Sequence, residues 1–395
     1  MYKFPHITCL DQVRAAIEGR DEFFVAERDW GYVVNYMVNL IDSFPTPNTK
    51  DPELNEKYKI RRECRGIKFG LDGNIIARPY SKFFNLGERS ETFPEVIDWD
   101  RKFIILDKLD GSMVHPILMD NVVVLCTKMG ITDVVAPAQD FAEKKGHKAI
   151  FYMDFCHDLM KSGMTPIFEW CSRKQRIVVD YPNDMLVLTA VRKMVTGEYK
   201  TYDQMEALAT PYRVPLVKCW SGTFDGINDF VEKAQILEGE EGYVFRFNSG
   251  EMFKSKNAWY VQLHKTKELL QFEKDVWALI LANQHDDAKA FMEQDDKDRI
   301  DAFAEDLYAA IDVTVDRLKW IVIAAKDNLN DSKKRFAIEV VNDHGPKVER
   351  GLLFKIWDDN DPRDVVHSHI RSHLGSGPKL EEVRCLADGI LWEDY

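Results

Sequence analysis

Hydrophobic positions follow two different patterns along the chain. In the first two-thirds, short runs rich in β-branched residues, such as Phe103–Leu106 and Asn121–Leu125, are bounded by Asp, Gly and Asn, a pattern typical of strands. Beyond Leu263, strand-like runs stop and segments with a 3.6-residue period take over. We therefore predict a mixed α+β domain over residues 1–264, followed by an all-helical C-terminal domain over residues 265–395.

The same patterns predict the elements of the first domain. Strands are expected at Phe23–Val25, Tyr32–Tyr36, Phe103–Leu106, Asn121–Leu125, Thr165–Trp170, Arg176–Val179, Met185–Leu188, Gly242–Phe247 and Glu251–Lys256, and helices at Leu10–Gly19, Ala136–Lys145, Ile150–Lys161, Tyr202–Ala209 and Ile227–Leu237. The runs on either side of Lys108 are interpreted as one hairpin. Arg61–Ala77 predicts another, turned at Asp72-Gly73, whereas Pro45–Glu56 and Pro79–Gly87 predict loops.

Helix-breaking signals divide the second domain. They lie at Asn328–Asp331, Gly345-Pro346, Asn360–Pro362 and Gly375–Pro378. The helices expected around them are Lys267–Ala282, Asp286–Gln294, Asp298–Ala310, Val313–Lys326, Ser332–Asn342 and Lys347–Trp357.

One stretch of the first domain, Asp107 to Ser112 (DKLDGS), suits covalent chemistry. A lysine is a nucleophile only as the free amine, a form that burial and neighbouring cations favour. Gly111 would allow close backbone approach to a ligand, and Asp110 and Ser112 offer hydrogen bonds to hold it. On its own K-x-D-G is a weak signal, because most surface Lys–Asp pairs are only solvated.

Composition narrows the class of protein. The chain has 395 residues, of which 45% are hydrophobic, enough for two or three domains. No apolar stretch is long enough to cross a bilayer, and the N-terminus lacks the order of a signal peptide. Seven scattered cysteines without C-x-x-C favour reduced thiols and oppose a zinc site. These features predict a soluble, cytoplasmic protein.

Charge is unevenly distributed. The net charge is −13, which opposes non-specific coating of nucleic acid, and about −11 of it falls in residues 268–395. The first domain carries compact basic clusters that could line a phosphate-binding cavity or simply face solvent. They are Lys59–Arg62 with Arg65 and Lys68, Arg173-Lys174 with Arg176, and Lys254, Lys256, Lys265 and Lys267.

Further polar residues follow Lys108 at intervals. Lys128 ends the next strand, and Glu169 lies in an apolar strand, where an isolated acid is costly to bury. Glu241 precedes a glycine at the head of another strand, and Lys254 and Lys256, two apart, share one strand face.

This order of motifs, KLDGS, FEW, EGYV and FKSK, resembles the covalent nucleotidyltransferase superfamily of DNA ligases, RNA ligases and mRNA capping enzymes. The segments ECRGIKF, RPYSKFFNLGE, RIVVDY and KSKNAWYVQLH are similar to the bacteriophage RNA ligase 1 family, the ATP-dependent ligases that repair broken tRNA. DDAKAF and DRLKWIVIAAKDN extend the resemblance, which spans nearly the whole chain.

The resemblance implies a fold and a reaction. It implies an adenylation (nucleotidyltransferase) domain of antiparallel sheets with flanking helices, and a helical domain that selects the RNA. The implied reaction uses ATP and Mg²⁺, forms AMP-lysine at Lys108, and joins RNA 5′-phosphate and 3′-hydroxyl ends. The implied partners are cleaved tRNA and an upstream polynucleotide kinase-phosphatase, with no membrane. Bacteriophage origin would place the protein in the host cytoplasm.

The resemblance also assigns roles to residues. The implied catalytic residues are Lys108, Glu169, Glu241, Lys254, Lys256 and Tyr260. The implied nucleotide-binding residues are Tyr36, Arg65, Lys82, Phe84, Gly111, Lys128, Glu169, Lys254 and Lys256. Asp287 matches a metal position of the family, and a slip of one residue would put Asp286 there instead.

Other interpretations stay open. Glu169 could be a satisfied strand carboxylate, Phe84 a core residue, and Asp286-Asp287 an ordinary helix N-cap. His367, His369 and His373 are not spaced to face one another on a helix and are left without a metal role. P-loop, dinucleotide-binding and zincin motifs do not occur in the sequence. The remaining alternatives are a GTP-using capping-type enzyme and a non-catalytic RNA-binding module.

Overall fold

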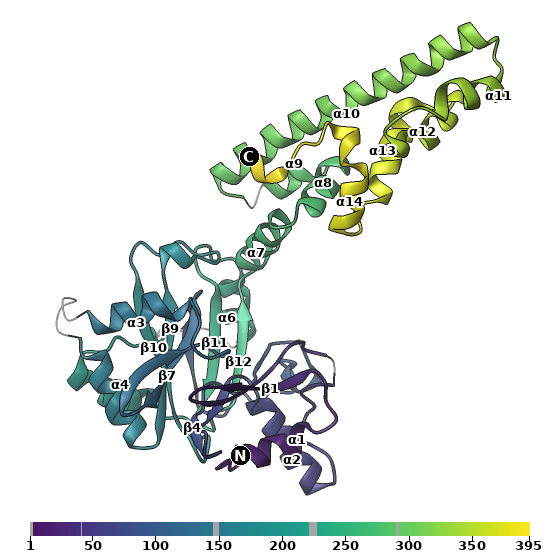
Figure 1. Ribbon diagram of the computed structural model, residues 1–395. Helices are drawn as coiled ribbons and strands as arrows, with labels where there is room; N and C mark the ends of the chain where they lie inside the picture. Colours follow the sequence, from purple (N-terminus) through teal and green to yellow (C-terminus); the bar gives the residue numbers. More distant parts are fainter. Residues whose placement is uncertain (1–2, 41, 145–149, 221–226, 290–291) are drawn as a thin grey trace. The chain divides into compact units, whose positions relative to one another are not determined.

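The chain forms two compact units, Met1–Val261 and Gln262–Tyr395. The structure, a computed structural model, describes residues 3–40, 42–144, 150–220, 227–289 and 292–395 (Figure 1). Within these residues the first unit combines helices with mostly antiparallel sheets, and the second unit is helical. The predicted α+β class with a helical C-terminal part is therefore confirmed. The predicted boundary after residue 264 falls inside helix α7 (Ala258–Leu270).

The N-terminal sheet has the order β1-β2-β3-β4, and its neighbouring strands are antiparallel. Its strands are β1 (Phe23–Arg28), β2 (Gly31–Tyr36), β3 (Ile67–Phe69) and β4 (Ile75–Ala77), and its helices are α1 (Leu10–Ile17) and α2 (Pro52–Glu63). Apolar residues of both helices and of three strands form one core, which includes Val13, Ile60, Val34 and Phe69. The predicted turn at Asp72-Gly73 joins β3 to β4.

Helix α2 was not predicted, because Pro45–Glu56 was interpreted as a loop and Arg61 as the start of a hairpin. The side chain of Asp51 caps the helix by accepting from the backbone N–H groups of Glu53 at 2.9 Å and Leu54 at 3.2 Å. Pro52 occupies the first turn, where its missing N–H costs nothing. The start signal was present in the sequence, but the helix itself is mostly polar and shows little apolar periodicity.

Two further sheets make up the rest of the first unit, with orders β10-β9-β7-β8 and β5-β12-β11-β6. Neighbouring strands are antiparallel except β5 and β12, which are parallel. The strands are β5 (Phe84–Asn85), β6 (Phe103–Lys108), β7 (Ser112–Met119), β8 (Val122–Cys126), β9 (Met164–Cys171), β10 (Met185–Lys193), β11 (Gly242–Phe247) and β12 (Met252–Lys256). The accompanying helices are α3 (Val135–Glu143), α4 (Tyr152–Lys161), α5 (Tyr202–Ala209) and α6 (Ile227–Gln235), with short turns η1 (Ser90–Thr92), η2 (Arg173–Gln175) and η3 (Thr210–Tyr212).

The predicted hairpin between Phe103–Leu106 and Asn121–Leu125 is wrong. Strand β6 pairs with β11, whereas β8 pairs with the unpredicted strand β7. The β7–β8 turn is made by Asp120 and Asn121, whose φ angles are 48° and 68°, the left-handed values that tight hairpins favour. Pro116 weakens the strand signal of β7, yet it lies beyond Ser112–Val114, the part that pairs with β9.

The predicted strand Arg176–Val179 is also wrong. The backbone N–H groups of Val178 and Val179 donate to the side chain of Asp110, both at 2.7 Å, rather than to a neighbouring strand. Val178 and Val179 are buried whereas Ile177 is exposed, and the amides of the two buried residues serve the loop that carries Asp110.

The second unit is built around one long helix, α10 (Gln294–Leu329). Its other elements are α8 (Glu273–Leu281), α9 (His285–Lys289), α11 (Lys333–Phe336), η4 (Ala337–Val341), α12 (Lys347–Trp357), α13 (Pro362–Ser372), α14 (Gly377–Val383), η5 (Arg384–Ala387) and η6 (Trp392–Asp394). The prediction of two helices within α10 is wrong, because the buried positions Leu307, Ile311, Val315 and Leu318 continue one face across the expected break.

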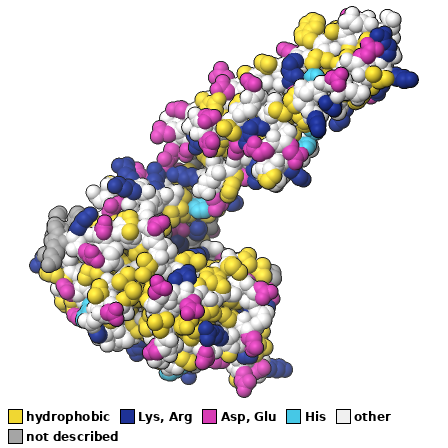
Figure 2. All heavy atoms as spheres, in the orientation of Figure 1, with side chains coloured by type: hydrophobic (Ala, Val, Ile, Leu, Met, Phe, Trp, Pro, Cys, Tyr) yellow, Lys and Arg dark blue, Asp and Glu magenta, His cyan; other side chains and the backbone are white. Residues whose placement is uncertain are grey.

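Charged side chains of both signs are interspersed on the visible face of the helical unit (Figure 2). None of the described helices is both long and apolar enough to cross a membrane.

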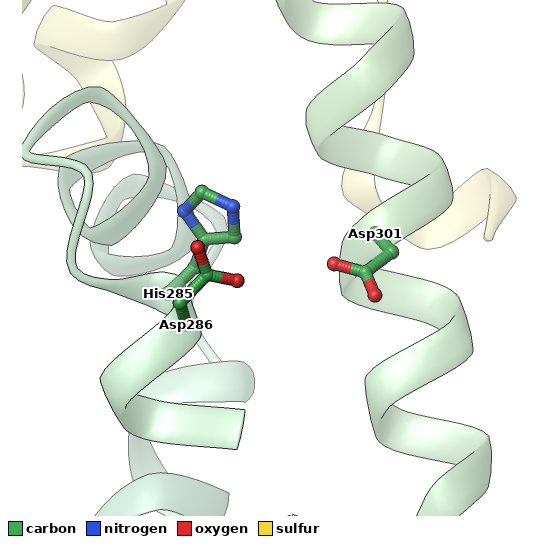
Figure 3. Close-up of side chains that lie close together, drawn as sticks. All are labelled: His285, Asp286 and Asp301. Carbon is green, nitrogen blue, oxygen red and sulfur yellow. The ribbon is translucent and has the colours of Figure 1, made fainter. Parts of the chain in front are cut away.

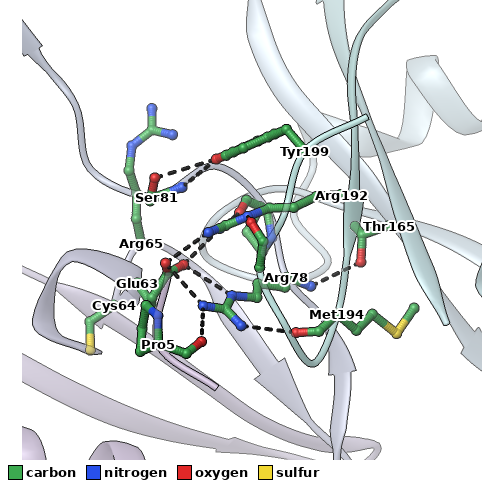
Figure 4. A network of polar contacts seen from close by, with 12 residues as sticks. Pro5, Glu63, Cys64, Arg65, Arg78, Ser81, Thr165, Arg192, Met194 and Tyr199 are labelled. Atoms are coloured by element: carbon green, nitrogen blue, oxygen red, sulfur yellow. Dashed lines mark hydrogen bonds and ion pairs between the residues drawn. The ribbon is translucent and has the colours of Figure 1, made fainter. Parts of the chain in front are cut away.

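A buried polar network connects the end of α2 to Arg78, which follows β4, and to Arg192 of β10 (Figure 4). The Glu63 carboxylate accepts from Arg192 at 2.6 and 2.7 Å and from Arg78 at 3.1 and 3.2 Å. Both arginines also donate to backbone carbonyls, for example from Arg192 to Pro79 and from Arg78 to Met194. The network fixes the chain two residues before Arg65, a predicted site residue.

Candidate active site

Strand pairing aligns three motifs at one end of the β5-β12-β11-β6 sheet. Gly242 pairs with Lys108 of β6 on one side and with Lys256 of β12 on the other. Gly242 has a φ of 146°, and a Cβ added there would lie 2.0 Å from the carbonyl oxygen of Ser255. Glycine is therefore required for the strands to approach. The residue before it, Glu241, is placed between the two lysines.

Glu241 forms ion pairs with both of these lysines. Its Oε2 lies 2.5 Å from Nζ of Lys108, and its Oε1 lies 3.2 Å from Nζ of Lys256. The carboxylate is almost fully buried, whereas the two lysines are partly exposed. The acid therefore holds both amines in place, Lys108 by a charge-assisted hydrogen bond and Lys256 by a longer ion pair.

The loop after Lys108 is anchored by Asp110, which is 4% exposed. Its Oδ2 accepts the two amides of Val178 and Val179, and its Oδ1 accepts the hydroxyl of Tyr260 at 2.7 Å. We expected Asp110 to offer hydrogen bonds to a ligand, but its carboxylate is bonded to the protein itself. Tyr260, which is predicted to be catalytic, contacts Asp110. The centroid of its ring also lies 4.9 Å from Nζ of Lys256.

Lys108 opens into a cavity of about 530 Å³. Six of the predicted site residues line it, namely Arg65, Lys108, Gly111, Lys128, Glu169 and Lys254. A Cβ on Gly111 would lie 2.4 Å from the backbone oxygen of Trp170. Glycine at position 111 therefore allows the two backbone segments to approach each other. The other predicted residues, Tyr36, Lys82, Phe84, Glu241, Lys256 and Tyr260, are not in its lining.

Lys254 and Glu169 are among the ionisable groups of this cavity that have shifted pKa values. Burial, and then the neighbouring charges of Lys108 and Lys256, lowers the pKa of Lys254 to about 8. Burial raises the pKa of Glu169 to about 7, although the nearby Lys108 opposes the shift. Perturbed groups that converge in one cavity are typical of a functional site.

A second group of predicted residues surrounds Tyr36. Nζ of Lys82 lies 4.9 Å from the Tyr36 ring centroid and 5.6 Å from that of Phe84, and Nζ of Lys128 lies 5.7 Å from the Tyr36 ring. Burial alone would raise the pKa of Tyr36, but Lys82, Arg65 and Lys128 together lower it. The structure therefore brings Tyr36, Lys82, Phe84 and Lys128 into one cation-rich cluster beside the cavity.

Sequence reasoning placed Lys68 in a basic cluster but missed that this lysine joins the two groups. Lys68 is completely buried, and its Nζ lies 3.0 Å from the oxygen of Gly66, 2.9 Å from that of Thr127 and 2.8 Å from Nε2 of His115. Gly66 follows Arg65 and Thr127 precedes Lys128, so Lys68 holds both cation-bearing segments together. A lysine inside the apolar strand IKF was the available signal.

Sequence reasoning also missed other residues that line the cavity, among them Tyr80, Thr189, Arg246 and Met252. Arg246 could have been found, because it lies four residues after Gly242 on the same strand and therefore on the same face.

The predicted metal residue Asp287 belongs to α9 in the second unit, and its side chain lies outside the described residues. Nearby, ligand atoms of His285, Asp286 and Asp301 lie within 4.8 Å of one another (Figure 3). Nζ of Lys289 lies 2.7 Å from Asp286 and 2.6 Å from Asp301, where it bridges the two carboxylates. The cluster is salt-bridged, and a metal ion on Asp287 or on Asp286 stays a prediction.

Comparison with known sequences identifies the family of the chain. A family model described as RNA ligase matches residues 63–270. A protein of Thermovibrio ammonificans, named as an RNA ligase by provisional assignment, is 31% identical over 287 residues, which cover 70% of this chain and 70% of the relative. The chain belongs to this RNA ligase family.

The solved structures that the chain partly matches include ligases. An archaeal ATP-dependent RNA ligase is 15% identical, with 74% of each chain covered and a TM-score of 0.43. A variant of Naegleria gruberi RNA ligase with ATP and Mn is 16% identical, covers 42% of this chain and 52% of its own, and has a TM-score of 0.34. The chain thus spans about half the length of the Naegleria structure.

Proposed function

We propose that the chain is an ATP-dependent RNA ligase that works through a covalent AMP on Lys108. The observation that carries this proposal is the alignment of Lys108, Glu241 and Lys256 by strand register, beside a cavity that Lys254 also enters. Family membership supports the same reaction class.

In the first step, Nζ of Lys108 attacks the α-phosphorus of ATP. A nitrogen–phosphorus bond forms, the bond to the β-phosphate bridging oxygen breaks, and pyrophosphate leaves with the electron pair. The lysine must first lose a proton, and Glu241, 2.5 Å away, is placed to accept it. Lys254, Lys256 and Arg65 supply positive charge for the phosphates, since phosphoryl transfer depends mainly on positioning and charge stabilisation.

In the later steps, an oxygen of the RNA 5′-phosphate attacks the same phosphorus, and the lysine leaves and regains its proton. The RNA 3′-hydroxyl then attacks the activated 5′-phosphate, a phosphodiester forms, and AMP is released. Glu169 is assigned to the ribose of the nucleotide, and the cluster of Tyr36, Lys82, Phe84 and Lys128 to the phosphates beside the cavity. Tyr260 is assigned a positioning role through Asp110.

Mg²⁺ on Asp287 remains a prediction from the family resemblance. When bound near the nucleotide, such an ion would supply charge neutralisation on phosphate oxygens. The residues described above carry out the steps without an assigned metal contact.

We further propose that the substrate is cleaved tRNA with 5′-phosphate and 3′-hydroxyl ends, and that residues 265–395 select it. An end-healing kinase-phosphatase would produce such ends. Joining of a cleaved anticodon stem-loop should exceed joining of unstructured RNA with identical ends. Equal rates for the two RNAs would contradict the tRNA assignment.

The test of the reaction separates adenylation from sealing. Lys108→Ala should abolish joining of 5′-phosphorylated RNA with ATP. The variant protein should still join RNA that already carries AMP on its 5′ end, provided Lys108 has no role after adenylation. Lys161→Ala, at an exposed lysine of the same unit, is the matched control. Wild-type protein that joins neither RNA would refute the proposed function.

A further inference from the structure

Lys68 is a buried cation that lies between two segments of the first unit, each of which carries a cation of the candidate site. Its Nζ donates to the carbonyl oxygen of Gly66 at 3.0 Å and to that of Thr127 at 2.9 Å. Gly66 directly follows Arg65, and Thr127 directly precedes Lys128. One ammonium group therefore connects the backbone beside Arg65 with the backbone beside Lys128.

The two segments are also packed against each other at Gly66. This residue has a φ of 91°, a value that favours glycine. A Cβ added to it would lie 2.6 Å from Cα of Lys128 and 2.8 Å from the carbonyl oxygen of Lys128. Two independent features thus fix the spacing of the segments, namely the absence of a side chain at position 66 and the hydrogen bonds of Lys68.

The third partner of Lys68 is His115, which is completely buried as well. Nε2 of His115 lies 2.8 Å from Nζ of Lys68. Burial, together with the charges of Lys68 and Arg65, holds the pKa of His115 well below its usual range, so the ring is neutral and its Nε2 can accept. Burial lowers the pKa of Lys68 to about 8, and no described carboxylate offsets its charge. A buried cation without a counter-ion is costly, so its presence here needs an explanation.

The two segments bring their cations to the same cavity. Arg65 and Lys128 both line the cavity that contains Lys108. Their described close contacts are with the sulfur of Met113 for Arg65 and with the ring of Tyr36 for Lys128, rather than with a carboxylate. Both charges are therefore available to an anionic ligand. Two cations bind one chain of phosphates together only if the distance between them matches that chain.

We propose that Lys68 is a positioning residue for the triphosphate of the nucleotide, which fixes the spacing of Arg65 and Lys128 so that both cations contact the phosphates at once. The proposal rests on the proposed function, because it takes the ligand of the cavity to be ATP. Lys68 contacts neither the ligand nor the reacting atoms, and it acts through the backbone of Gly66 and Thr127. Its loss should weaken the contacts to phosphate and leave the contacts to the nucleoside unchanged.

Two variants change the spacing in different ways. Lys68→Met fills a similar space without the amine, and Gly66→Ala forces the two segments apart while Lys68 is kept. The control for the first is Lys161→Met, at an exposed lysine of the same unit. The control for the second is Gly19→Ala, because Gly19 also has a positive φ, 70°, but an added Cβ there meets nothing within 4 Å.

The experiment compares the binding of a triphosphate with that of a nucleoside. The protein is first treated with pyrophosphate to remove covalent AMP, and calorimetry then gives dissociation constants for α,β-methylene-ATP, which cannot release pyrophosphate, and for adenosine. Lys68→Met and Gly66→Ala should bind the triphosphate analogue about 10- to 100-fold more weakly than wild type, and adenosine within about twofold of wild type. A merely structural defect would weaken both ligands, because the nucleoside depends on the same fold.

A double variant tests whether Lys68 acts through Lys128. Lys128→Ala removes one of the two contacts that Lys68 is proposed to position. In the Lys128→Ala background, Lys68→Met should therefore weaken binding of the triphosphate analogue by a smaller factor than in wild type.

Three results would overturn the proposal. They are unchanged binding of the triphosphate analogue by Lys68→Met, equal weakening of the analogue and of adenosine, and full multiplication of the two losses in the double variant. If Lys68→Met does not fold, Gly66→Ala decides, and unchanged binding by folded Gly66→Ala would overturn the proposal. Failure of the proposed function is distinguishable, because wild type would then form no AMP-lysine on Lys108.

Discussion

Removing the Asp110 carboxylate should destabilise the first unit and slow adenylation. Asp110 holds the loop that follows Lys108 through three buried hydrogen bonds, from the amides of Val178 and Val179 and from the hydroxyl of Tyr260. Asp110→Ala removes all three acceptors at once. The two amides then have no partner, and the loop that orients the nucleophile loses its tether.

The expected magnitudes follow from these contacts. Each buried amide left unpaired costs about 1–3 kcal/mol, so the two amides together should lower the free energy of unfolding of Asp110→Ala by about 2–6 kcal/mol. Asp110→Asn can keep both amides on its oxygen, and the hydroxyl of Tyr260 can turn to accept from the new amide group. We therefore expect a loss of only about 1–3 kcal/mol for Asp110→Asn, mainly the contribution of the charge.

Hydrogen exchange with peptide mass spectrometry is the assay, because it reads the two amides directly. In Asp110→Ala the peptide that contains Val178 and Val179 should lose protection, while peptides of the second unit keep theirs. Asp184→Asn changes the same charge at an exposed acid of the same unit and should change nothing. Retained protection of the two amides in a folded Asp110→Ala protein would refute the reasoning.

Three other predictions concern pH, backbone approach and the buried network. Lys254, with a pKa of about 8, is a cation below that pH, so kcat/KM for ATP should fall as pH rises through about 8. Lys254→Arg should move this fall in kcat/KM to higher pH. An unchanged pH profile would exclude Lys254 as the group that titrates. Gly111→Ala places a Cβ 2.4 Å from the oxygen of Trp170 and should slow the adenylation burst at least about tenfold, whereas Gly351→Ala, which meets nothing within 4 Å, should not. Glu63→Gln leaves two buried arginines without their acid and should cost about 3–5 kcal/mol in denaturant unfolding; a cost below 1 kcal/mol would contradict the assigned role.

Local sequence signals predicted much of the architecture. The apolar runs of β9 and β11 were sufficient because these strands are buried on both faces. The 3.6-residue period after Leu263 was sufficient because it marks the buried face of each helix. The prediction failed where pairing or hydrogen bonding is non-local. Nothing local in Phe103–Leu106 shows that its partner is β11, and nothing in Arg176–Val179 shows that its amides serve Asp110.

The candidate site was likewise predicted where local motifs mark it and missed where contacts are non-local. The motifs located Lys108, Glu241, Lys254 and Lys256, and the strand register explains why a glycine follows the acid. The sequence could not show that Asp110 is bonded to the protein itself, since that depends on a loop about 70 residues away. Nor could it show that Lys68 donates to the carbonyl oxygen of Thr127, because that residue is 59 positions away in the sequence.

The central claim is that Lys108 carries AMP during the reaction. The most direct measurement is incubation of purified protein with Mg²⁺ and α-labelled ATP or GTP, followed by peptide mass spectrometry of the labelled site. The account predicts label from ATP on Lys108 and loss of that label when RNA with a 5′-phosphate is added. Label from GTP alone would indicate a capping-type enzyme. Absence of label from folded protein that is not already adenylated would contradict the account and favour a non-catalytic RNA-binding module.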